Sequence, residues 1–209
     1  MENVYDGFVS RHLNRRISRP LAYILAYTPV TPNQVSFASL GIALATFFFF
    51  LYGLHITAAL LAQTVSIVDG VDGDLARRKK MSSAFGGYMD SMLDRYADAL
   101  IFLGLTIWAA GDDASVYVWL TGFWALAGAF AVTYSRARIE HAPRNLFDRG
   151  VMSAASRDVR LFVLMVGALT GQGFVTLIVL ASLTNTVVLL RLLYMRHVLK
   201  RTNSLSQNP

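Results

Sequence analysis

Long apolar runs alternate with short polar breaks along this chain, and the pattern predicts helices that cross a membrane. A helix needs about 20 mostly apolar residues to span the hydrocarbon core of a bilayer. Suitable runs cover residues 33–53, 56–77, 86–110, 115–137, 157–171 and 173–195, and the fifth is the shortest. We therefore expect an all-α membrane protein with six transmembrane helices.

The first twenty residues follow a different pattern, since apolar and basic positions interleave there. Val9, Leu13 and Ile17 recur at helical spacing, with arginines between them. This pattern is typical of an amphipathic helix that lies on the membrane surface. The predicted division of the chain is an amphipathic juxtamembrane helix at 1–20, a transmembrane domain at 21–200 and a polar C-terminal tail at 201–209.

The first predicted span has a clear start signal. Thr31 can cap the helix, Pro32 suits the first helical position, and Gln34 can reach back to complete a capping box. We expect the helix to begin directly after Thr31.

Composition supports a membrane protein, and the distribution of basic residues predicts its orientation in the membrane. The chain is 55% hydrophobic and only 15% charged, whereas a soluble domain carries about 25% charged residues. The turns predicted near 53–56, 111–115 and 171–173 contain no lysine or arginine, so all nineteen basic residues lie on or near the opposite side. The positive-inside rule then places both termini in the cytoplasm. Apart from Arg77, we expect basic clusters such as residues 77–80 to serve as topology signals and contacts with anionic lipid, and we expect no nucleic-acid partner.

Two pairs of aspartates stand out, because an ionised side chain within a bilayer is costly and usually faces a bundle interior or a wet cavity. Asp69 and Asp72 lie three residues apart near the cytoplasmic end of the second span. Asp90 and Asp94 lie four residues apart near the cytoplasmic start of the third. Residues at these spacings share a helix face, and the two spans run in opposite directions. The four carboxylates are therefore expected to converge just inside the cytoplasmic face.

Converging carboxylates repel one another unless a cation holds them together. Oxygen ligands without cysteine or nearby histidine suit hard cations such as Mg²⁺ or Mn²⁺, and pairs of divalent ions are common in phosphoryl transfer. One alternative is an ion-pair network with Arg77 and Arg95. Another is a cation transporter, which would distribute polar residues through the full depth of the membrane.

The same region contains a longer motif: D-x-x-D-G-x-x-A-R, then eight residues, then G-x-x-x-D-x-x-x-D. Its fixed positions are filled by Asp69, Asp72, Gly73, Ala76, Arg77, Gly86, Asp90 and Asp94. This motif resembles the signature of the CDP-alcohol phosphotransferase family, also called CDP-alcohol phosphatidyltransferases. Enzymes of this family move a phosphoalcohol group from a CDP-linked donor to an acceptor hydroxyl and release CMP.

The resemblance implies a role for each residue of the motif. It implies two divalent cations, Mg²⁺ or Mn²⁺, whose ligands would be Asp69, Asp72, Asp90 and Asp94. Asp94 would also be the catalytic general base that takes the proton of the acceptor. The CDP site would be lined by Asp72, Gly73, Ala76, Arg77 and Gly86. The family further implies a homodimer in the cell membrane, with the active site facing the cytoplasm.

Three arginines in the last three spans bear on the acceptor. Arg136, Arg157 and Arg191 lie near the cytoplasmic ends of these spans, and guanidinium groups bind phosphate through two parallel hydrogen bonds. The alternative is that these arginines only follow the positive-inside rule and bind no substrate. Their places resemble the inositol-phosphate-accepting branch of the family, in which they would bind the acceptor phosphate. That branch usually has lysine where Arg136 stands.

Two segments of this sequence resemble one group within that branch, the di-myo-inositol phosphate phosphate synthases. The segments are DGVDGDLAR with SSAFGGYMDSMLDRYADAL, and SRDVRLFVLMVGAL. The resemblance implies that CDP-inositol reacts with inositol 1-phosphate to give a phosphorylated di-myo-inositol phosphate. The alternative is a phospholipid synthase, as in phosphatidylinositol-phosphate synthases, which would use CDP-diacylglycerol or an archaeal CDP-ether lipid with inositol phosphate or another polar alcohol. Several of the resembling enzymes carry a fused cytidylyltransferase, so a separate cytidylyltransferase is a possible partner.

Overall fold

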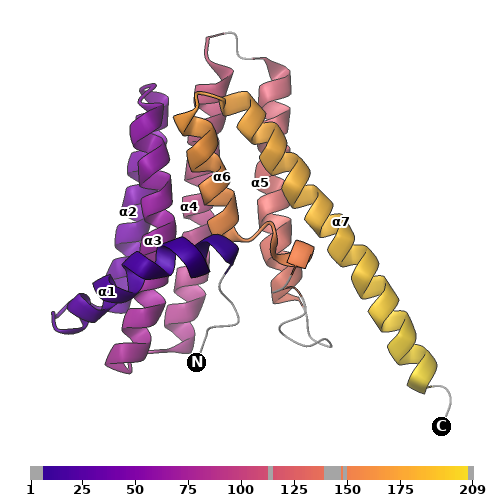
Figure 1. The fold of residues 1–209 in the computed structure, drawn as a ribbon, viewed down its shortest axis with the longest axis horizontal. Coiled ribbons are helices and arrows are strands. Elements are labelled where there is room, and N and C mark those ends of the chain that lie inside the picture. Colours follow the sequence, from indigo (N-terminus) through magenta and orange to yellow (C-terminus); the bar gives the residue numbers. More distant parts are fainter. Residues whose placement is uncertain (1–6, 113–114, 139–146, 148–149, 207–209) are drawn as a thin grey trace.

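The computed structural model describes residues 7–112, 115–138, 147 and 150–206, with side chains up to residue 198 (Figure 1). This part of the chain is helical apart from short turns. The elements are a π-helix at Ser10–Asn14, α1 (Arg15–Ala26), α2 (Pro32–Leu51), α3 (His55–Lys79), α4 (Ala84–Ala110), α5 (Val116–Ala137), a 3-10 helix at Gly150–Ser153, α6 (Arg157–Leu169) and α7 (Gly173–Ser206).

Every predicted span is a helix in the structure, so the all-α prediction is confirmed for the described residues. Three segments are long and apolar enough to cross a membrane: α2, α5 and Gly173–Val198 of α7. With 25 and 27 residues, α3 and α4 have sufficient length, but both carry charged side chains. α6 has only 13 residues. The chain is therefore a multi-pass membrane protein in which three spans stand out by length and composition.

The start of α2 follows the predicted capping box. The backbone N–H of Gln34 donates to Oγ1 of Thr31 at 3.4 Å, and the N–H of Thr31 donates to Oε1 of Gln34 at 2.9 Å. Pro32 occupies the first helical position, where its missing N–H costs nothing. These contacts fix the point at which the chain enters the bundle.

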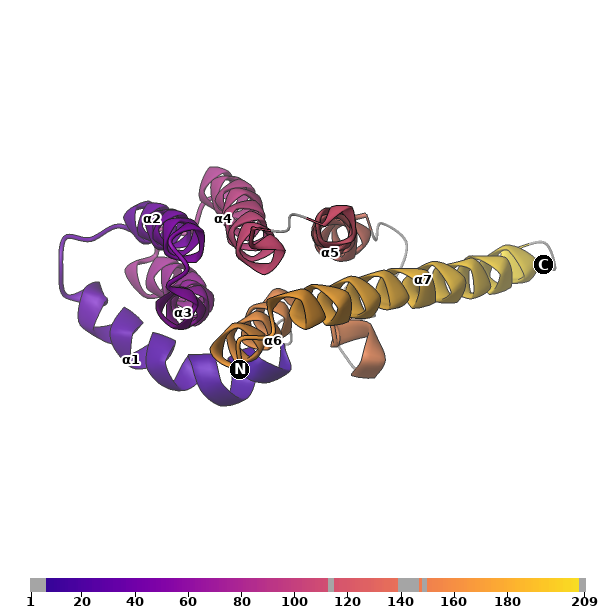
Figure 2. The same ribbon diagram turned by 90° about the horizontal axis from the view of Figure 1, so that it is seen from above.

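The bundle has two groups of helices. α2, α3 and α4 form one group, α5 and α7 form the other, and α6 packs against α3 and α7 (Figure 2). Small residues permit close packing of membrane helices. A Cβ added to Gly104 of α4 would lie 3.1 Å from Cα of Phe47 in α2, so these backbones nearly touch. The C-terminal part of α7 extends away from the other helices in both views (Figures 1 and 2).

α1 crosses the long helices at a steep angle instead of running along them (Figure 1). It continues to Ala26 rather than ending at residue 20 as predicted, and it passes through Pro20. Pro20 removes one backbone hydrogen bond. However, Ala22 packs in a buried cluster with Val35, Val71 and Leu75. Burial of these apolar side chains favours continuing the helix along α3.

The predicted apolar stripe of this first helical segment divides between two faces. Val9 is buried, whereas Leu13 and Ile17 are exposed. The face turned toward α3 is polar, since Asn14 and Ser18 are buried there. The exposed apolar residues therefore remain on a side of the helix that a membrane surface can contact.

Polar contacts fix α1 over α3. Nδ2 of Asn14 donates to Oγ of Ser66 at 2.8 Å, and Nε2 of Gln63 donates to Oδ1 of Asn14 at 2.7 Å. Beyond α1, Nζ of Lys79 donates to the carbonyl oxygens of Thr28 and Val30 at 2.5 and 2.7 Å. α1 is thereby held across the part of α3 that carries the motif aspartates.

Candidate active site

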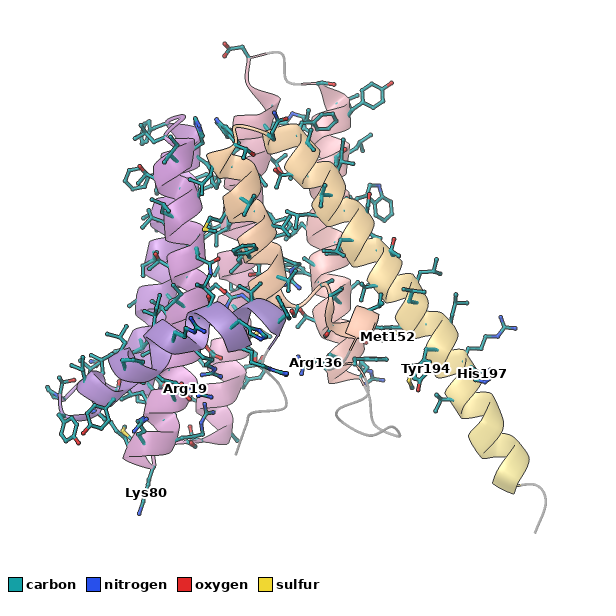
Figure 3. All side chains as sticks on the ribbon, in the orientation of Figure 1. Arg19, Lys80, Arg136, Met152, Tyr194 and His197 are labelled. Atoms are coloured by element: carbon teal, nitrogen blue, oxygen red, sulfur yellow. The ribbon has the colours of Figure 1, made fainter. Side chains whose placement is uncertain are left out.

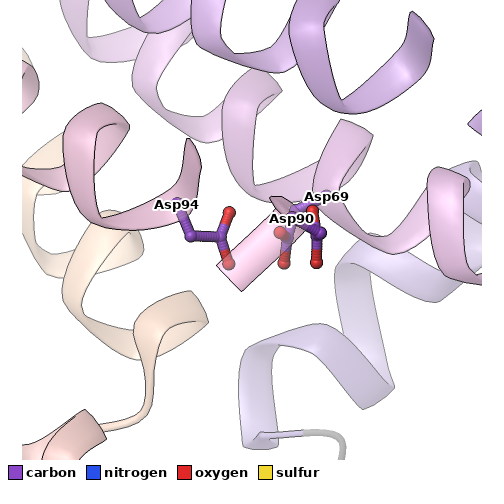
Figure 4. Close-up of side chains that lie close together, drawn as sticks. All are labelled: Asp69, Asp90 and Asp94. Atoms are coloured by element: carbon purple, nitrogen blue, oxygen red, sulfur yellow. The ribbon is translucent and has the colours of Figure 1, made fainter. Parts of the chain in front are cut away.

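The antiparallel helices α3 and α4 bring three of the four predicted metal ligands together (Figure 4). Asp69, Asp90 and Asp94 each offer a carboxylate oxygen within 4.8 Å of those of the other two, and all three residues are partly buried. In the close-up, the carboxylate of Asp94 points toward those of Asp69 and Asp90 (Figure 4). These three side chains therefore converge, as their spacing along the two helices predicts.

The fourth predicted ligand, Asp72, is buried beside this cluster. Its Oδ2 accepts a hydrogen bond of 2.6 Å from Oγ of Ser36 in α2, and its Oδ1 accepts one of 2.5 Å from the N–H of Gly73. The carboxyl groups of Asp72 and Asp90 lie within hydrogen-bonding range of each other. Asp72 is thus oriented by α2, and it extends the row of carboxylates toward that helix.

Arg157, at the start of α6, is the cation that enters the cluster. Its Nη1 lies 2.7 Å from Oδ1 of Asp69 and 2.8 Å from Oδ1 of Asp94. Its Nε donates to Oδ1 of Asp98 at 2.8 Å. Oδ2 of Asp98 in turn accepts a hydrogen bond of 2.9 Å from Nη2 of Arg160. The sequence reading of Arg157 as a ligand of the acceptor phosphate did not include these ion pairs.

The ion-pair network proposed from the sequence, with Arg77 and Arg95, differs from the one in the structure. Arg77 pairs with Asp74 rather than with the cluster, and Arg95 approaches Asp94 only to 3.6 Å. Both residues follow closely on aspartates along the chain, but Arg157 reaches the cluster because α6 packs against α3. The pairing therefore depends on tertiary structure, which helical spacing within one span does not reveal.

The carboxylate set fits a divalent metal centre. Among the described residues, the four motif aspartates share Arg157 and the more distant Arg95 as cationic contacts. Negative charge is therefore in excess, and each carboxylate supplies hard oxygen ligands. These properties suit Mg²⁺ or Mn²⁺ better than softer metals.

A cavity of about 360 Å³ opens beside the cluster, and we call it the large cavity. It is lined by the four motif aspartates and by all three arginines predicted to bind the acceptor: Arg136, Arg157 and Arg191. Arg136 lies at the end of α5 (Figure 3). Arg191 is buried, and its Nη1 donates to the carbonyl of Val132 at 2.6 Å and to Oγ of Ser135 at 2.8 Å. Arg191 therefore also holds α7 against the end of α5.

A second cavity of about 170 Å³ lies between the start of α2, the end of α3 and the start of α4, and we call it the small cavity. It is lined by all five residues predicted for CDP: Asp72, Gly73, Ala76, Arg77 and Gly86. A Cβ added to Gly86 would lie 3.0 Å from Oγ of Ser83, and one added to Gly73 would lie 3.5 Å from Nη1 of Arg77. A larger side chain at either position would take up space in this cavity.

The two cavities meet at the carboxylates. Asp72, Gly73, Arg77 and Asp90 line both of them. A molecule in the small cavity and a molecule in the large cavity would therefore approach each other at the aspartate cluster. This arrangement suits the transfer of a group between two substrates.

From the sequence, Asp98 continues the stripe of Asp90 and Asp94 by one more turn and is expected to pair with Arg95. In the structure it pairs with Arg157 and Arg160 instead. Two further residues that shape the site were not predicted. Arg160 had a signal in the sequence, since it lies about one turn after Arg157. Ser36 had none, because a serine in an apolar span is common. Its role depends on where α2 meets α3.

Residues 29–188 match the family model described as CDP-alcohol phosphatidyltransferase. The chain is 43% identical over 191 residues to a bifunctional IPC transferase and DIPP synthase of Rubrobacter xylanophilus, which covers 91% of this chain and 43% of that protein. It is 31% identical over 196 residues to an archaetidylinositol phosphate synthase of Methanothermobacter thermautotrophicus, which covers 91% of this chain and 94% of that protein. The chain spans less than half the length of the bifunctional relatives that it matches.

The fold is similar to that of a phosphatidylinositol phosphate synthase of Mycobacterium tuberculosis. The structure of that protein with CDP-DAG bound has a TM-score of 0.68 and 22% identity, with 85% of this chain and 92% of that chain covered. The structure in complex with manganese and citrate has a TM-score of 0.69 and 21% identity, with 84% and 87% covered. The likeness shows that the two proteins share a membrane fold.

Proposed function

This chain belongs to the CDP-alcohol phosphatidyltransferase family, and we propose that it is a membrane CDP-alcohol phosphotransferase. It moves a phosphoalcohol group from a CDP-linked donor to an acceptor hydroxyl and releases CMP. The observation that carries this proposal is the row of carboxylates between two cavities. One cavity is lined by the residues predicted for CDP and the other by three arginines.

Two divalent cations, Mg²⁺ or Mn²⁺, would be held by Asp69, Asp72, Asp90 and Asp94. When bound, they neutralise the donor diphosphate and the charge that develops on the CMP leaving group. The excess of carboxylates over cations among the described residues supports this assignment. So does the manganese in the structure of the mycobacterial relative.

The donor occupies the small cavity. Gly73, Ala76 and Gly86 leave room there for the nucleotide, and Arg77 faces the diphosphate from the boundary with the large cavity. A guanidinium suits a diphosphate because it offers two parallel hydrogen bonds. This placement puts the phosphorus that is to be transferred close to the carboxylates.

The acceptor occupies the large cavity, where Asp94 is the general base. An oxygen of the acceptor hydroxyl attacks the phosphorus that carries the alcohol, its proton passes to Asp94, and the bond to the bridging oxygen breaks as CMP leaves. Arg157 holds the Asp94 carboxylate in place at 2.8 Å. Arg136, Arg157 and Arg191 line the space for the phosphate of the acceptor.

Six transmembrane helices with both termini in the cytoplasm accommodate this site. Lys80 and Arg136 lie at the end of the bundle opposite to the turns that lack basic residues (Figure 3). Although α6 is short, it can reach the far side of the membrane because it does not start at the cytoplasmic surface. Its first residue, Arg157, pairs with Asp69 and so lies at the same depth in the bilayer as Asp69. Asp69 lies about 12 Å along α3 from Arg77, and 13 residues of α6 add about 20 Å. The sum is close to the thickness of the hydrocarbon core, about 30 Å.

The substrates are proposed to be CDP-inositol and inositol 1-phosphate, which would give a phosphorylated di-myo-inositol phosphate. The 43% identity to a bifunctional IPC transferase and DIPP synthase supports this choice. A phospholipid synthase that uses CDP-diacylglycerol or an archaeal CDP-ether lipid is the second candidate, favoured by the match to an archaetidylinositol phosphate synthase over nearly its full length. A homodimer and a separate cytidylyltransferase remain proposed partners.

The deciding experiment measures CMP release by the purified protein with Mg²⁺ and inositol 1-phosphate. CMP release with CDP-inositol but not with CDP-diacylglycerol supports the synthase of a soluble product. CMP release with CDP-diacylglycerol alone supports the phospholipid synthase. A protein that releases no CMP from any CDP-alcohol with any polyol phosphate would contradict the transferase itself, and a cation transporter would then have to be considered.

A further inference from the structure

Asp74 of α3 joins two arginines from different parts of the chain. Its Oδ2 lies 2.7 Å from Nη1 of Arg15 in the surface helix α1, and its Oδ1 accepts a hydrogen bond of 2.5 Å from Nη2 of Arg77. The side chains of Arg15 and Asp74 are 11% and 13% exposed, whereas that of Arg77 is 51% exposed. Arg15 and Asp74 therefore form a largely buried anchor, and Arg77 is the solvent-facing end of the network.

The contact with Asp74 restrains the side chain of Arg77, which lines both cavities. A surface arginine samples many rotamers, and ordering it during binding costs conformational entropy. Asp74 holds the Arg77 guanidinium over Gly73, where an added Cβ would lie 3.5 Å from Nη1. The guanidinium is therefore already placed at the junction of the two cavities before any ligand arrives.

The surface helix contributes through Arg15. Besides Asp74, Nη1 of Arg15 donates to the carbonyl of Gly70 at 3.1 Å. The helices pack closely at this point, since a Cβ added to Gly70 would lie 3.2 Å from Oγ of Ser18. Arg15 thus binds the turn of α3 that carries Asp69 and Asp72. The position of these motif residues therefore depends on the packing of α1 against α3.

Arg77 also brings a positive charge to the boundary between the two cavities. Its guanidinium attracts an anion, and it does so most strongly where protein excludes water. A diphosphate has the charge and the size to use it.

We propose that Asp74 is a positioning residue that holds Arg77 for the diphosphate of the CDP-linked donor. Arg15 makes this placement depend on the docking of α1 against α3. The inference rests on the proposed function, because it takes the small cavity as the donor site. Asp74 acts through Arg77, so removing Asp74 should affect the donor and leave the acceptor nearly unaffected. A role confined to fastening α1 onto α3 would not discriminate between the two substrates.

The test measures CDP binding to the full chain in detergent with Mg²⁺, by calorimetry, together with the KM values for donor and acceptor. The variants are Asp74→Asn, Asp74→Glu, Arg77→Ala and the double variant Asp74→Asn with Arg77→Ala. Arg15→Gln probes the surface helix, and Arg16→Gln is its matched control because Arg16 is exposed on the same helix.

Asp74→Asn is expected to weaken CDP binding and to raise the donor KM by roughly tenfold, while the acceptor KM changes less than about twofold. Asp74→Glu should recover part of the binding. In the Arg77→Ala background, Asp74→Asn should have no further effect, since its target is gone. Arg15→Gln should weaken CDP binding in the same direction, and Arg16→Gln should match the wild type.

Equal rises in both KM values, unchanged CDP binding, or full additivity with Arg77→Ala would overturn the positioning role. Arg15→Gln with no more effect than Arg16→Gln would remove α1 from the proposal. A wild type that binds CDP but releases no CMP contradicts the proposed function and leaves the binding test valid. A wild type that binds no CDP would overturn both.

Discussion

Arg157 at the start of α6 and Asp94, the last residue of the motif, in α4, form an ion pair of 2.8 Å. The contact joins a residue predicted to bind the acceptor to the residue predicted to take its proton. Nη1 of Arg157 also reaches Asp69 at 2.7 Å. The guanidinium therefore lies between the proposed metal ligands and the large cavity, and the proposed roles of these residues can be separated by mutation.

Asp94→Asn should abolish turnover while donor binding remains. The amide keeps the shape of the side chain but cannot accept the proton of the acceptor hydroxyl, and loss of a general base costs roughly 10²- to 10⁴-fold in rate. CMP release measures turnover, and calorimetry with CDP measures donor binding. Asp112→Asn is the control, since Asp112 is exposed in the turn at the other end of α4. Turnover at the wild-type rate would remove Asp94 from the role of base.

Asp69→Asn and Asp90→Asn should shift the dependence of activity on Mg²⁺ to higher concentration. Changes in the outer shell of a metal site already cost about 10- to 100-fold in affinity, so loss of a ligand should cost at least roughly tenfold. A titration of CMP release against Mg²⁺ measures the shift. Chelation with EDTA should abolish activity, and added Mg²⁺ or Mn²⁺ should restore it. An unchanged Mg²⁺ titration in both variants would contradict the ligand assignment.

Arg157→Ala should raise the KM for a phosphorylated acceptor more than the KM for the CDP donor. A charge-assisted hydrogen bond to phosphate is lost, which should raise the acceptor KM by roughly tenfold or more. Steady-state kinetics with each substrate varied in turn measure the split. Arg136→Ala provides the comparison, because Arg136 lines the same cavity from α5. If Arg157→Ala raises both KM values equally, Arg157 serves the aspartate cluster rather than the acceptor.

Much of this architecture could be predicted from the sequence because its signals are local. Apolar runs located every long helix, and the triplet Thr31, Pro32 and Gln34 marked the start of α2. The spacing of Asp69, Asp90 and Asp94 was enough to expect convergence, because it depends only on helical periodicity and on two adjacent antiparallel helices.

What the sequence did not reveal depends on contacts between distant segments. The pairing of Arg157 with three aspartates requires α6 to dock against α3 and α4. The hydrogen bond from Ser36 to Asp72 requires α2 to pack beside them. Similarly, α1 runs past Pro20 because of apolar burial against α3, a gain that local helix propensity does not include.

The proposed orientation can be tested with single cysteines, since the natural chain contains none. In sealed, right-side-out membrane vesicles, a membrane-impermeant maleimide should label Asp112→Cys but not Lys80→Cys. Lys80 follows the end of α3 in the basic turn that we propose to be cytoplasmic, whereas Asp112 lies in a turn without basic residues. Both positions should react after the vesicles are opened with detergent, which controls for burial. The reverse pattern in intact vesicles would place the active site outside.

The buried pair of Asp98 and Arg160 yields a prediction about stability that differs from the predictions about catalysis. Both residues are only 1% exposed, and Asp98 also pairs with Arg157. Asp98→Asn should lower the free energy of unfolding by about 3–5 kcal/mol, because it leaves buried arginine charge without its partner.

The double variant Asp98→Leu with Arg160→Leu should regain most of that stability, because it removes the second charge as well. Its activity should nevertheless stay low, since Arg157 has lost one of the two carboxylates that orient it from α4. Thermal unfolding in detergent measures the first effect and CMP release the second. An unchanged melting temperature for Asp98→Asn would show that the pair does not stabilise the fold.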